Sequence, residues 1–318
     1  MILIFMKKIF KKEYNYVEGV YTFSHSDSGA DKINTFYSVK PFPSYQKNEQ
    51  IPEILSKGNS NYLAKEFKEF AGSKKTILEA GCGTGQLSSY LSIGNNNNII
   101  SFDATDASLN ELQKFIDKSG IKNITLVKGS ILDEIFLENS FDMVWCSGVL
   151  HHTVNPYLGF KILCKYLKPG GHIVVGLYNK YSRLRTIIRR KIYNSIPNKV
   201  LKQKYINYFD PYLRKLSRNK IINSDKIESW IRDQYEHPIE STHTFREVLN
   251  WFKNNNIEFL SSIPSIQKNS YDNQIVDNLF EKRKIKSNFQ IRINEIFSTF
   301  SVLGSEGGLF VMIGKKSK

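Results

Sequence analysis

The chain contains few cysteines and no long apolar run. Its three cysteines, Cys82, Cys146 and Cys164, all fall in segments that are expected to form the core of a sheet. They are therefore not expected to form a disulfide framework, which indicates a reducing compartment. No apolar run approaches the roughly 20 residues that a bilayer-spanning helix needs. The apolar start, Met1 to Met6, is too short for a secretory core and precedes its charges. We therefore expect a cytoplasmic protein with no membrane span.

Acidic residues are also under-represented. The formal net charge is +15, and between Lys180 and Lys220 the only acid is Asp210. Such an excess of positive charge suggests an anionic partner, such as nucleic acid or a membrane surface. A general bias toward Lys, Asn and Ile, visible in the run Asn95 to Asn98, is the simpler explanation of the total charge.

No spacing of histidine, cysteine and acid matches a metal site, and we predict none.

The segment from Thr76 to Leu87 combines an apolar strand, the acid Glu79 and three glycines at alternate positions, followed by a helical pattern. Glycine permits backbone conformations that other residues avoid, and it lets a ligand approach the backbone closely. A dinucleotide-binding fingerprint has its third glycine one position later, where this chain has Gln86. The turn therefore predicts a nucleoside site and disfavours a nicotinamide or flavin cofactor.

Alternating strands and helices follow this turn. Apolar strands are expected at 99–103, 124–128, 141–147 and 172–178, with helices beginning near Thr105 and at Pro156. A capping box at Thr244 and Glu247 predicts a helix to about Asn254, and strands are expected at 257–263 and 308–314. This alternation is typical of a parallel sheet with helices on both faces.

The glycine turn, together with Phe141-Asp-Met-Val, Leu150-His-His and Leu167-Lys-Pro-Gly-Gly, resembles the class I S-adenosylmethionine (SAM)-dependent methyltransferase superfamily, type 11/12-like. The resemblance covers Thr76 to Tyr178. It implies an α/β fold with a doubly wound, seven-stranded, mostly parallel sheet, whose last strand runs antiparallel between the fifth and sixth. Helical insertions would follow strands 5 and 6. The expected parts are an N-terminal extension or cofactor strap (1–59), a SAM-binding core (60–179), a basic helical insertion acting as a lid or dimer contact (180–243), and the rest of the core (244–318) with an insertion at 265–301.

The resemblance also implies the residues that bind SAM. Asp103 would accept from the ribose hydroxyls, and Glu79 would reinforce the binding of the methionine ammonium at Gly81. The family often has Gly-Asp after the third strand, where the acid accepts from the adenine amino group, but this chain has Gly129-Ser130. The full set of expected cofactor-binding residues is Glu79, Gly81, Cys82, Gly83, Gly85, Gln86, Asp103, Ala104, Ser130, Ile131 and Ser147.

Histidines and tyrosines are the candidates for the acceptor end. His151 and His152 follow the fourth expected strand (141–147), where an imidazole can take a proton from the methyl acceptor. His151 is the stronger candidate for this role. Alternatively, the two histidines orient the loop. Tyr178 is a further substrate candidate, and His237 and His243 are expected either in a substrate wall or in a capped loop. The aromatic, proline-rich segment 36–45 is expected to be too stiff for a helix, and Tyr37 or Tyr45 would cover the cofactor or form a surface strap.

Three functions remain open from the sequence. The first is methyl transfer to an oxygen, or a nitrogen, of a small molecule or of a glycan or lipid precursor. The second is RNA methylation that uses the basic insertion. Strand 4 ends in Cys146-Ser-Gly-Val rather than in the Asn/Asp-Pro-Pro-aromatic signature of enzymes that methylate base nitrogens. The third is a SAM-binding scaffold without catalysis, although the intact Glu79 and Asp103 argue against lost cofactor binding.

Overall fold

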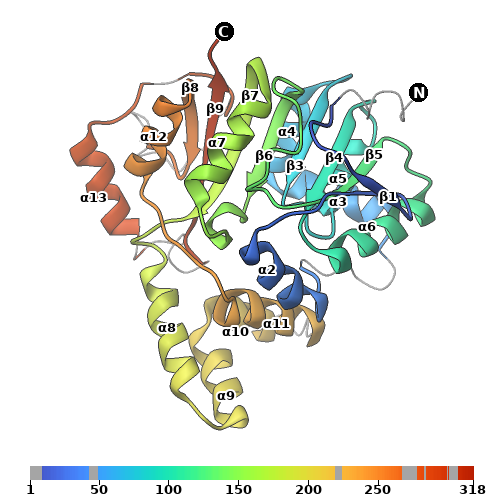
Figure 1. The fold of residues 1–318 in the computed structure, drawn as a ribbon. Helices are drawn as coiled ribbons and strands as arrows, with labels where there is room; N and C mark the ends of the chain where they lie inside the picture. The colour runs from blue at the N-terminus through green and yellow to red at the C-terminus, as the bar shows by residue number, and fades with distance from the viewer. Residues whose placement is uncertain are drawn as a thin grey trace.

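A sheet of nine strands forms the centre of the computed structural model, which describes residues 9–42, 49–218, 224–266, 278–282, 284–298, 300 and 307–318 (Figure 1). The strand order is β1-β2-β5-β4-β3-β6-β7-β9-β8. The strands are β1 (Asn15–Val17), β2 (Val20–Thr22), β3 (Thr76–Ala80), β4 (Asn98–Asp103), β5 (Ile124–Lys128), β6 (Phe141–Ser147), β7 (Leu167–Tyr178), β8 (Ile257–Ile263) and β9 (Leu309–Lys316).

Helices cover both faces of this sheet, and a further group projects past the carboxyl ends of β6 and β7 (Figure 1). The helices in the first half of the chain are α2 (Ser28–Ser38), α3 (Ile51–Ser60), α4 (Tyr62–Ala71), α5 (Gln86–Ser92), α6 (Asp106–Ser119) and α7 (Pro156–Tyr166). The projecting group contains α8 (Leu184–Ser195), α9 (Lys199–Phe209), α10 (Pro211–Arg218), α11 (Ser224–Ile231) and the π-helical turn η2 (Arg232–Glu236). The remaining helical elements are α12 (Phe245–Asn254), α13 (Asn288–Ser298) and the 3-10 turn η1 (Leu150–His152).

The winding of the chain fixes where a ligand can bind. From the central β3 the chain moves outward through β4 and β5, and it then returns to β6 and β7 on the other side of β3. All of these neighbours pair in parallel. In such sheets the ligand crevice lies beyond the carboxyl ends of the strands at the point where the order reverses, here β3 and β6. The predicted doubly wound fold is thus confirmed, as is the antiparallel strand β9 between β7 and β8.

The sheet is buried on both faces. All five residues of β3 are buried, and alternate side chains enter different cores. Leu78 packs with Ile100 and Val144 in the larger core, whereas Ile77 packs with Ile99 in a second core. Burial on both faces is what an almost continuous apolar strand requires, and each fully buried aliphatic side chain contributes about 2 kcal/mol.

The N-terminal extension adds two strands to the seven that the sequence predicted. β2 pairs in parallel with β5, and β1 completes a short hairpin at the edge of the sheet. Aromatic contacts anchor this hairpin: the ring centroid of Phe10 lies 5.1 Å from that of Tyr21 and 5.0 Å from that of Phe23. Strands of three residues are too short for a periodic pattern, so only this packing reveals them.

The expectation that residues 36–45 avoid a helix is wrong for their first three residues. α2 extends to Ser38 and therefore includes Phe36 and Tyr37. The prolines that suggested a stiff segment begin at Pro41, beyond the end of the helix. Asp27 starts α2 by accepting a hydrogen bond from the backbone N–H of Gly29 (2.9 Å), which is the usual role of an N-cap carboxylate.

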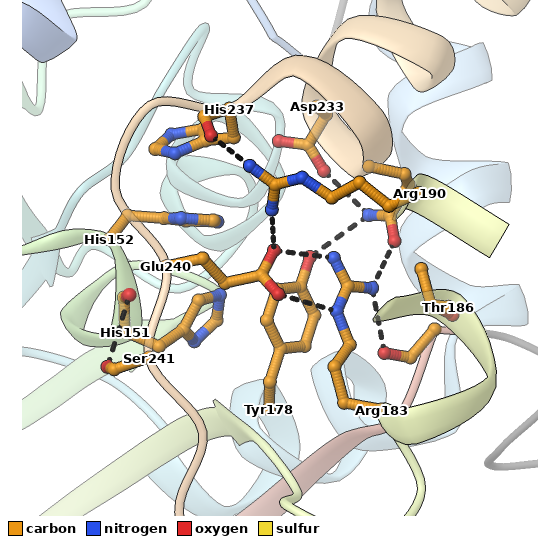
Figure 2. Close-up of polar contacts among 12 residues, drawn as sticks. His151, His152, Tyr178, Arg183, Thr186, Arg190, Asp233, His237, Glu240 and Ser241 are labelled. Carbon is orange, nitrogen blue, oxygen red and sulfur yellow. Dashed lines mark hydrogen bonds and ion pairs between the residues drawn. The ribbon is translucent and has the colours of Figure 1, made fainter. Parts of the chain in front are cut away.

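A buried arginine connects the helical insertion to the sheet. The Arg183 side chain is 0% exposed, and its guanidinium donates to both carboxylate oxygens of Glu240, at 3.1 and 2.7 Å (Figure 2). It also donates to the Gln234 side chain and to the Gly307 carbonyl, and it lies 3.7 Å from the centroid of the Tyr178 ring. One side chain therefore holds together the end of β7, the turn η2, the loop before α12 and the start of β9.

Replacing this arginine should destabilise the protein strongly. In Arg183→Leu the Glu240 carboxylate keeps only Arg190 as a charged partner, and breaking a buried ion pair costs about 3–5 kcal/mol. We expect a loss of about 3 kcal/mol in the free energy of unfolding, measured by urea denaturation. The matched control is Arg246→Leu, at an exposed position of α12, which should change it by less than about 0.5 kcal/mol. Equal losses in the two variants would contradict the role of Arg183.

Candidate active site

A cavity of about 490 Å³ opens at the carboxyl ends of β3, β4 and β6, where the winding of the sheet places a ligand. One part is bordered by the glycine turn after β3, the end of β4 and the loop after β5. Another part is bordered by α2, η1, α11 and η2. The lining includes Glu79, Gly81, Cys82, Gly83, Gln86, Asp103, Ala104, Ser130, Ile131 and Ser147. The structure thus brings together ten of the eleven residues that were expected to bind the cofactor.

The glycine turn has the close contacts that its sequence implied. Gly81 has a φ of 75°, and a Cβ there would lie 2.2 Å from Cγ2 of Val149. Its backbone N–H donates to the Phe102 carbonyl of β4 at 2.7 Å. Gly85, the eleventh expected residue, does not line the cavity. It caps α5 in the left-handed conformation, and a Cβ there would lie 2.3 Å from Leu112, so this glycine is needed for packing against α6.

Asp103 lies at the end of β4 and is held by the turn opposite. One carboxylate oxygen accepts from the Gly83 N–H at 2.7 Å, and the other accepts from the backbone N–H and the hydroxyl of Thr105, at 2.9 and 2.7 Å. A carboxylate has about four acceptor positions, so these three bonds leave about one for a ligand hydroxyl. Burial raises the pKa of Asp103, and these hydrogen bonds act in the opposite direction. The carboxylate is therefore oriented before any ligand binds.

Glu79 is a buried carboxyl next to the turn. Burial raises its pKa to about 8, although the Ser88 hydroxyl donates to it. Ser88 in turn accepts from the hydroxyl of Ser101 at 2.6 Å. A carboxyl with this pKa is largely neutral at pH 7, and a cation bound beside it would favour the ionised form.

Asp27 is a cavity residue that the sequence analysis missed. Its second carboxylate oxygen accepts from the Ser130 hydroxyl at 2.6 Å, and both residues line the cavity. Ser130 also accepts from the Leu132 N–H at 3.1 Å. The serine that replaces the family's acid is therefore paired with an acid from the N-terminal extension. Its N-cap position was the only signal in the sequence, and that signal gives no information on tertiary contacts.

Aromatic and polar side chains form the other part of the cavity. Tyr37 donates to Asp233 at 2.9 Å, and the Gln234 amide donates to the Tyr178 hydroxyl at 3.0 Å and to Asp233 at 2.7 Å. Trp230 lines the same region. Burial raises the pKa of Asp233, and both burial and the Asp233 charge raise that of Tyr37. Tyr37 and Tyr178 thus lie where the sequence analysis placed substrate candidates, whereas Asp233, Gln234 and Trp230 were not foreseen.

The two histidines of η1 differ in their access to the cavity. His152 lines it, and its Nδ1 lies 2.8 Å from the Ile239 carbonyl. A carbonyl only accepts, so Nδ1 carries the proton and Nε2 of the neutral ring carries the lone pair. His151 is completely buried, 3.9 Å from the Tyr178 ring between centroids, and does not line the cavity (Figure 2). Of these two histidines, His152 therefore borders the cavity, whereas His151 does not.

Burial keeps this group of histidines neutral. It lowers the pKa of His152 to about 4 and that of His237 to about 3, and it places the pKa of His151 well below its usual value. The rings of His152 and His237 lie 3.6 Å apart between centroids, so His237 supports His152 from behind the cavity wall. His243 lies away from the cavity, where it contacts Glu247 at 2.8 Å beside the capping box of α12. Tyr45 lies outside the described residues.

Two features are absent from the part of the chain that the structure describes. Within the described residues, no cluster of three or more His, Cys, Asp or Glu side chains can hold a metal ion. None of the helices in that part of the chain is long and apolar enough to cross a membrane.

Known proteins share both the sequence pattern and the fold. A family described as "Methyltransferase domain" matches residues 71–231. An uncharacterized protein of Synechococcus sp. is 27% identical over 261 residues, which cover 74% of this chain and 60% of that protein. The ubiquinone biosynthesis O-methyltransferase of Rickettsia conorii is 25% identical over 171 residues, 52% of this chain and 56% of that protein. The chain thus spans about 60% or less of the length of these two relatives.

A solved structure shares the fold. Geranyl diphosphate C-methyltransferase from Streptomyces coelicolor, solved with S-adenosyl-L-homocysteine, has a TM-score of 0.51 at 13% identity, with 92% of this chain and 100% of that chain covered. The family match covers half of the chain and includes the glycine turn, Asp103 and both histidines of η1. The chain belongs to the class I S-adenosylmethionine-dependent methyltransferases.

Proposed function

We propose that this protein transfers the methyl group of SAM to an oxygen, or a nitrogen, of a small molecule or of a glycan or lipid precursor. The observation that supports it is that one cavity joins the glycine turn and Asp103 to a wall of Tyr37, His152 and Asp233. Its volume of about 490 Å³ lies in the range of small-molecule sites. A cofactor and an acceptor bound there would be adjacent, which is what direct transfer requires.

The residues of the turn fit the methionine and ribose parts of SAM. In the proposed complex the ammonium lies near Gly81 and Glu79, and its charge shifts the raised pKa of Glu79 downward, so that the carboxyl ionises. Asp103 accepts from the ribose through its remaining acceptor position. When bound, SAM supplies a methyl group on a positively charged sulfur, which is open to in-line displacement. The absence of a side chain at Gly81 allows the close approach that this arrangement needs.

The pair of Asp27 and Ser130 fits the adenine end. Both line the cavity beside Ile131, which offers an apolar wall to the base. The Ser130 hydroxyl already donates to Asp27, so we assign the carboxylate of Asp27, rather than the serine, as the acceptor for the adenine amino group. A charged acceptor forms a stronger hydrogen bond than a neutral hydroxyl.

His152 is the candidate base at the acceptor end. The Ile239 carbonyl fixes its tautomer and leaves Nε2 free to take a proton, while burial keeps the ring neutral in the physiological range. In the proposed reaction the acceptor oxygen or nitrogen would bond to the methyl carbon while the carbon–sulfur bond breaks, with its electron pair remaining on the sulfur of S-adenosylhomocysteine. Nε2 would receive the proton that leaves the acceptor. Asp233 and Tyr37 would orient the acceptor. Relatives of similar sequence include an O-methyltransferase and a sterol 24-C-methyltransferase. The choice of oxygen or nitrogen as the acceptor atom is therefore our proposal.

RNA methylation receives less support from the structure. Arg183 is buried against Glu240, and Arg190 donates to Glu240 and to the His237 carbonyl, so neither is available to a phosphate. These two residues are part of the basic run that suggested nucleic acid in the first place.

The acceptor class can be tested with SAM carrying a labelled methyl group. The purified protein is incubated with a cell extract that is then separated into small-molecule, lipid, glycan and RNA fractions. We expect label in a small-molecule, lipid or glycan fraction, and none with Asp103→Ala, which loses the ribose contact. Label in the RNA fraction alone would contradict the proposed acceptor, and labelling of no fraction by the wild type would favour the scaffold.

Asp27→Asn should weaken SAM binding about tenfold, because a charge-assisted hydrogen bond is replaced by a neutral one while Asn still caps α2. Isothermal titration calorimetry measures the Kd. The control is Asp31→Asn in the same helix, where the side chain is 73% exposed. S-inosylhomocysteine carries a carbonyl oxygen in place of the amino group, so it should lose no affinity in Asp27→Asn, whose side-chain amide can donate to that oxygen. A tenfold loss for that ligand too would show that Asp27 acts on the fold and not on the amino group.

His152→Ala should leave the Kd for SAM unchanged and lower kcat about 100-fold or more, which is the usual contribution of a general base. The assay is methyl transfer to the acceptor fraction identified above. Added imidazole should restore part of the activity if the lost group was a base. His151→Leu, which replaces a ring without polar partners among the described residues, should retain most of the activity. A larger loss in His151→Leu than in His152→Ala would restore the order predicted from sequence.

A further inference from the structure

Helices α8 and α9 form a hairpin that projects from the molecule and is joined by a three-residue connection at 196–198 (Figure 1). Its inner side is packed. Tyr193 of α8 and Ile206 of α9 belong to a small core with Tyr235 of η2, and the Lys202 ammonium lies 4.9 Å from the centroid of the Tyr193 ring. The hairpin is therefore an attached part of the fold, and its outer side can be considered by itself.

The outer side carries an unusual number of exposed apolar side chains. Leu184, Ile188 and Ile192 are 48%, 50% and 45% exposed and recur every four residues, which makes a continuous stripe along α8. On α9, Val200, Leu201 and Tyr208 are 63%, 55% and 68% exposed. Scattered single apolar residues are normal on a protein surface, but a continuous apolar patch marks an interaction site.

The two stripes lie on the same side of the hairpin. Tyr193 of α8 faces Lys202 of α9. At about 100° per residue, Ile192 and Ile188 are rotated by about 100° and 140° from Tyr193 around α8. Leu201 and Tyr208 are rotated in the same sense, by about 100° and 120°, from Lys202 around α9. The two helices run antiparallel, so the same rotation leads to the same side of the pair. The stripes therefore make one apolar surface, which we call the hairpin face.

The charges around this face have one sign. Between Leu184 and Phe209 the chain has seven lysines and arginines and no acid. Arg190 points inward to Glu240, but Lys191, Lys199 and Lys204 are exposed. Lys191 borders the α8 stripe, and Lys204 lies within the α9 stripe. A long lysine side chain can rest on an apolar surface while its ammonium reaches a polar layer.

We propose that the hairpin face binds the surface of a membrane that contains anionic lipid, with the helices lying in the interface. Apolar side chains that insert at the level of the headgroups, combined with flanking lysines and an interfacial tyrosine such as Tyr208, are what an interfacial helix needs. Anionic headgroups complement the positive charge of the lysines around the face.

Two other occupants fit less well. A polynucleotide would use the lysines but would leave the aliphatic stripes in water, because its affinity comes from phosphates and stacked bases. A second copy of the chain in a twofold dimer would place this basic surface against itself, where like charges repel. Of these three occupants, the lipid surface accounts for both the apolar and the basic residues.

Membrane binding would also bring the cavity close to lipid. The hairpin contacts η2 through Tyr193, whose ring centroid lies 5.4 Å from that of Tyr235 and whose hydroxyl donates to Glu236 at 3.0 Å. Asp233 and Gln234 of the same turn line the cavity. A lipid precursor is therefore the acceptor class that this geometry favours; this consequence rests on the proposed methyl transfer, whereas membrane binding itself does not.

Vesicle co-sedimentation tests the proposal on the full chain without any acceptor. We expect binding to phosphatidylcholine vesicles that contain phosphatidylglycerol, weaker binding to pure phosphatidylcholine, and a loss of affinity as salt rises. The triple variant Ile188→Ser/Ile192→Ser/Leu201→Ser should lose about tenfold or more in affinity. Lys191→Gln/Lys199→Gln/Lys204→Gln should lose a similar factor for the anionic vesicles only.

Matched controls distinguish binding through the hairpin face from nonspecific adsorption to vesicles. Phe289→Ser/Phe297→Ser on α13 removes side chains that are 74% and 67% exposed, and Lys114→Gln/Lys118→Gln/Lys122→Gln removes the same number of charges elsewhere. Both should bind vesicles like the wild type. The proposal is overturned if the wild type fails to bind anionic vesicles or if the controls lose as much as the hairpin variants. It is also overturned if the chain is a dimer that only the serine variant dissociates. Methyl transfer is assayed separately, so its failure would not count against the membrane site.

Discussion

The hydrogen bond between the Gly83 N–H and the Asp103 carboxylate joins the ends of the two central strands, β3 and β4, and the cavity depends on it. It forms because the turn after β3 has no side chain at this position and can approach β4 closely. The Gly81 N–H reinforces the approach by donating to Phe102. Binding of a nucleoside would then need no large rearrangement, because the sheet already orients the hydrogen-bond acceptors. These groups lose their water when the chain folds, so that cost does not arise again on binding.

The acceptor end has a different origin. Its side chains come from α2 of the N-terminal extension, from α11 and η2 of the insertion, and from η1, which follows β6 in the core. Long-range polar contacts hold these elements together. Arg183 connects η2 to the end of β7, the loop before α12 and the start of β9. Tyr37 of α2 donates to Asp233 of η2 across nearly 200 positions of sequence. A scaffold shared by many methyltransferases is thus completed by elements particular to this chain. Substrate choice is expected to reside in such added elements, because a fold alone does not determine function.

Burial has opposite effects on the acids and the histidines of the site. It raises the pKa of Glu79, Asp103 and Asp233 and lowers that of His152 and His237. Both shifts favour neutral groups inside the cavity. A bound sulfonium with its ammonium would restore charge to the acids, while the imidazole of His152 stays unprotonated. These shifts support the proposed binding of a cationic methyl donor and the proposed role of His152 as the proton acceptor.

The sequence alone determined the core of the fold and the cofactor end of the site. The apolar strands, the capping box at Thr244 and the glycine turn are local patterns, and residues such as Glu79, Gly81 and Asp103 lie at fixed positions relative to their own strands. Only the tertiary structure revealed Asp27 beside Ser130, Asp233 beside Tyr37, and the different access of His151 and His152 to the cavity. The contacts of His152, Asp27 and Tyr37 join positions 87, 103 and 196 apart, and they depend on packing that no local pattern encodes. The basic run at 180–220 shows both cases. The spacing of its apolar residues predicted a helical insertion, but only folding decided that Arg183 and Arg190 point inward while the hairpin face remains on the surface.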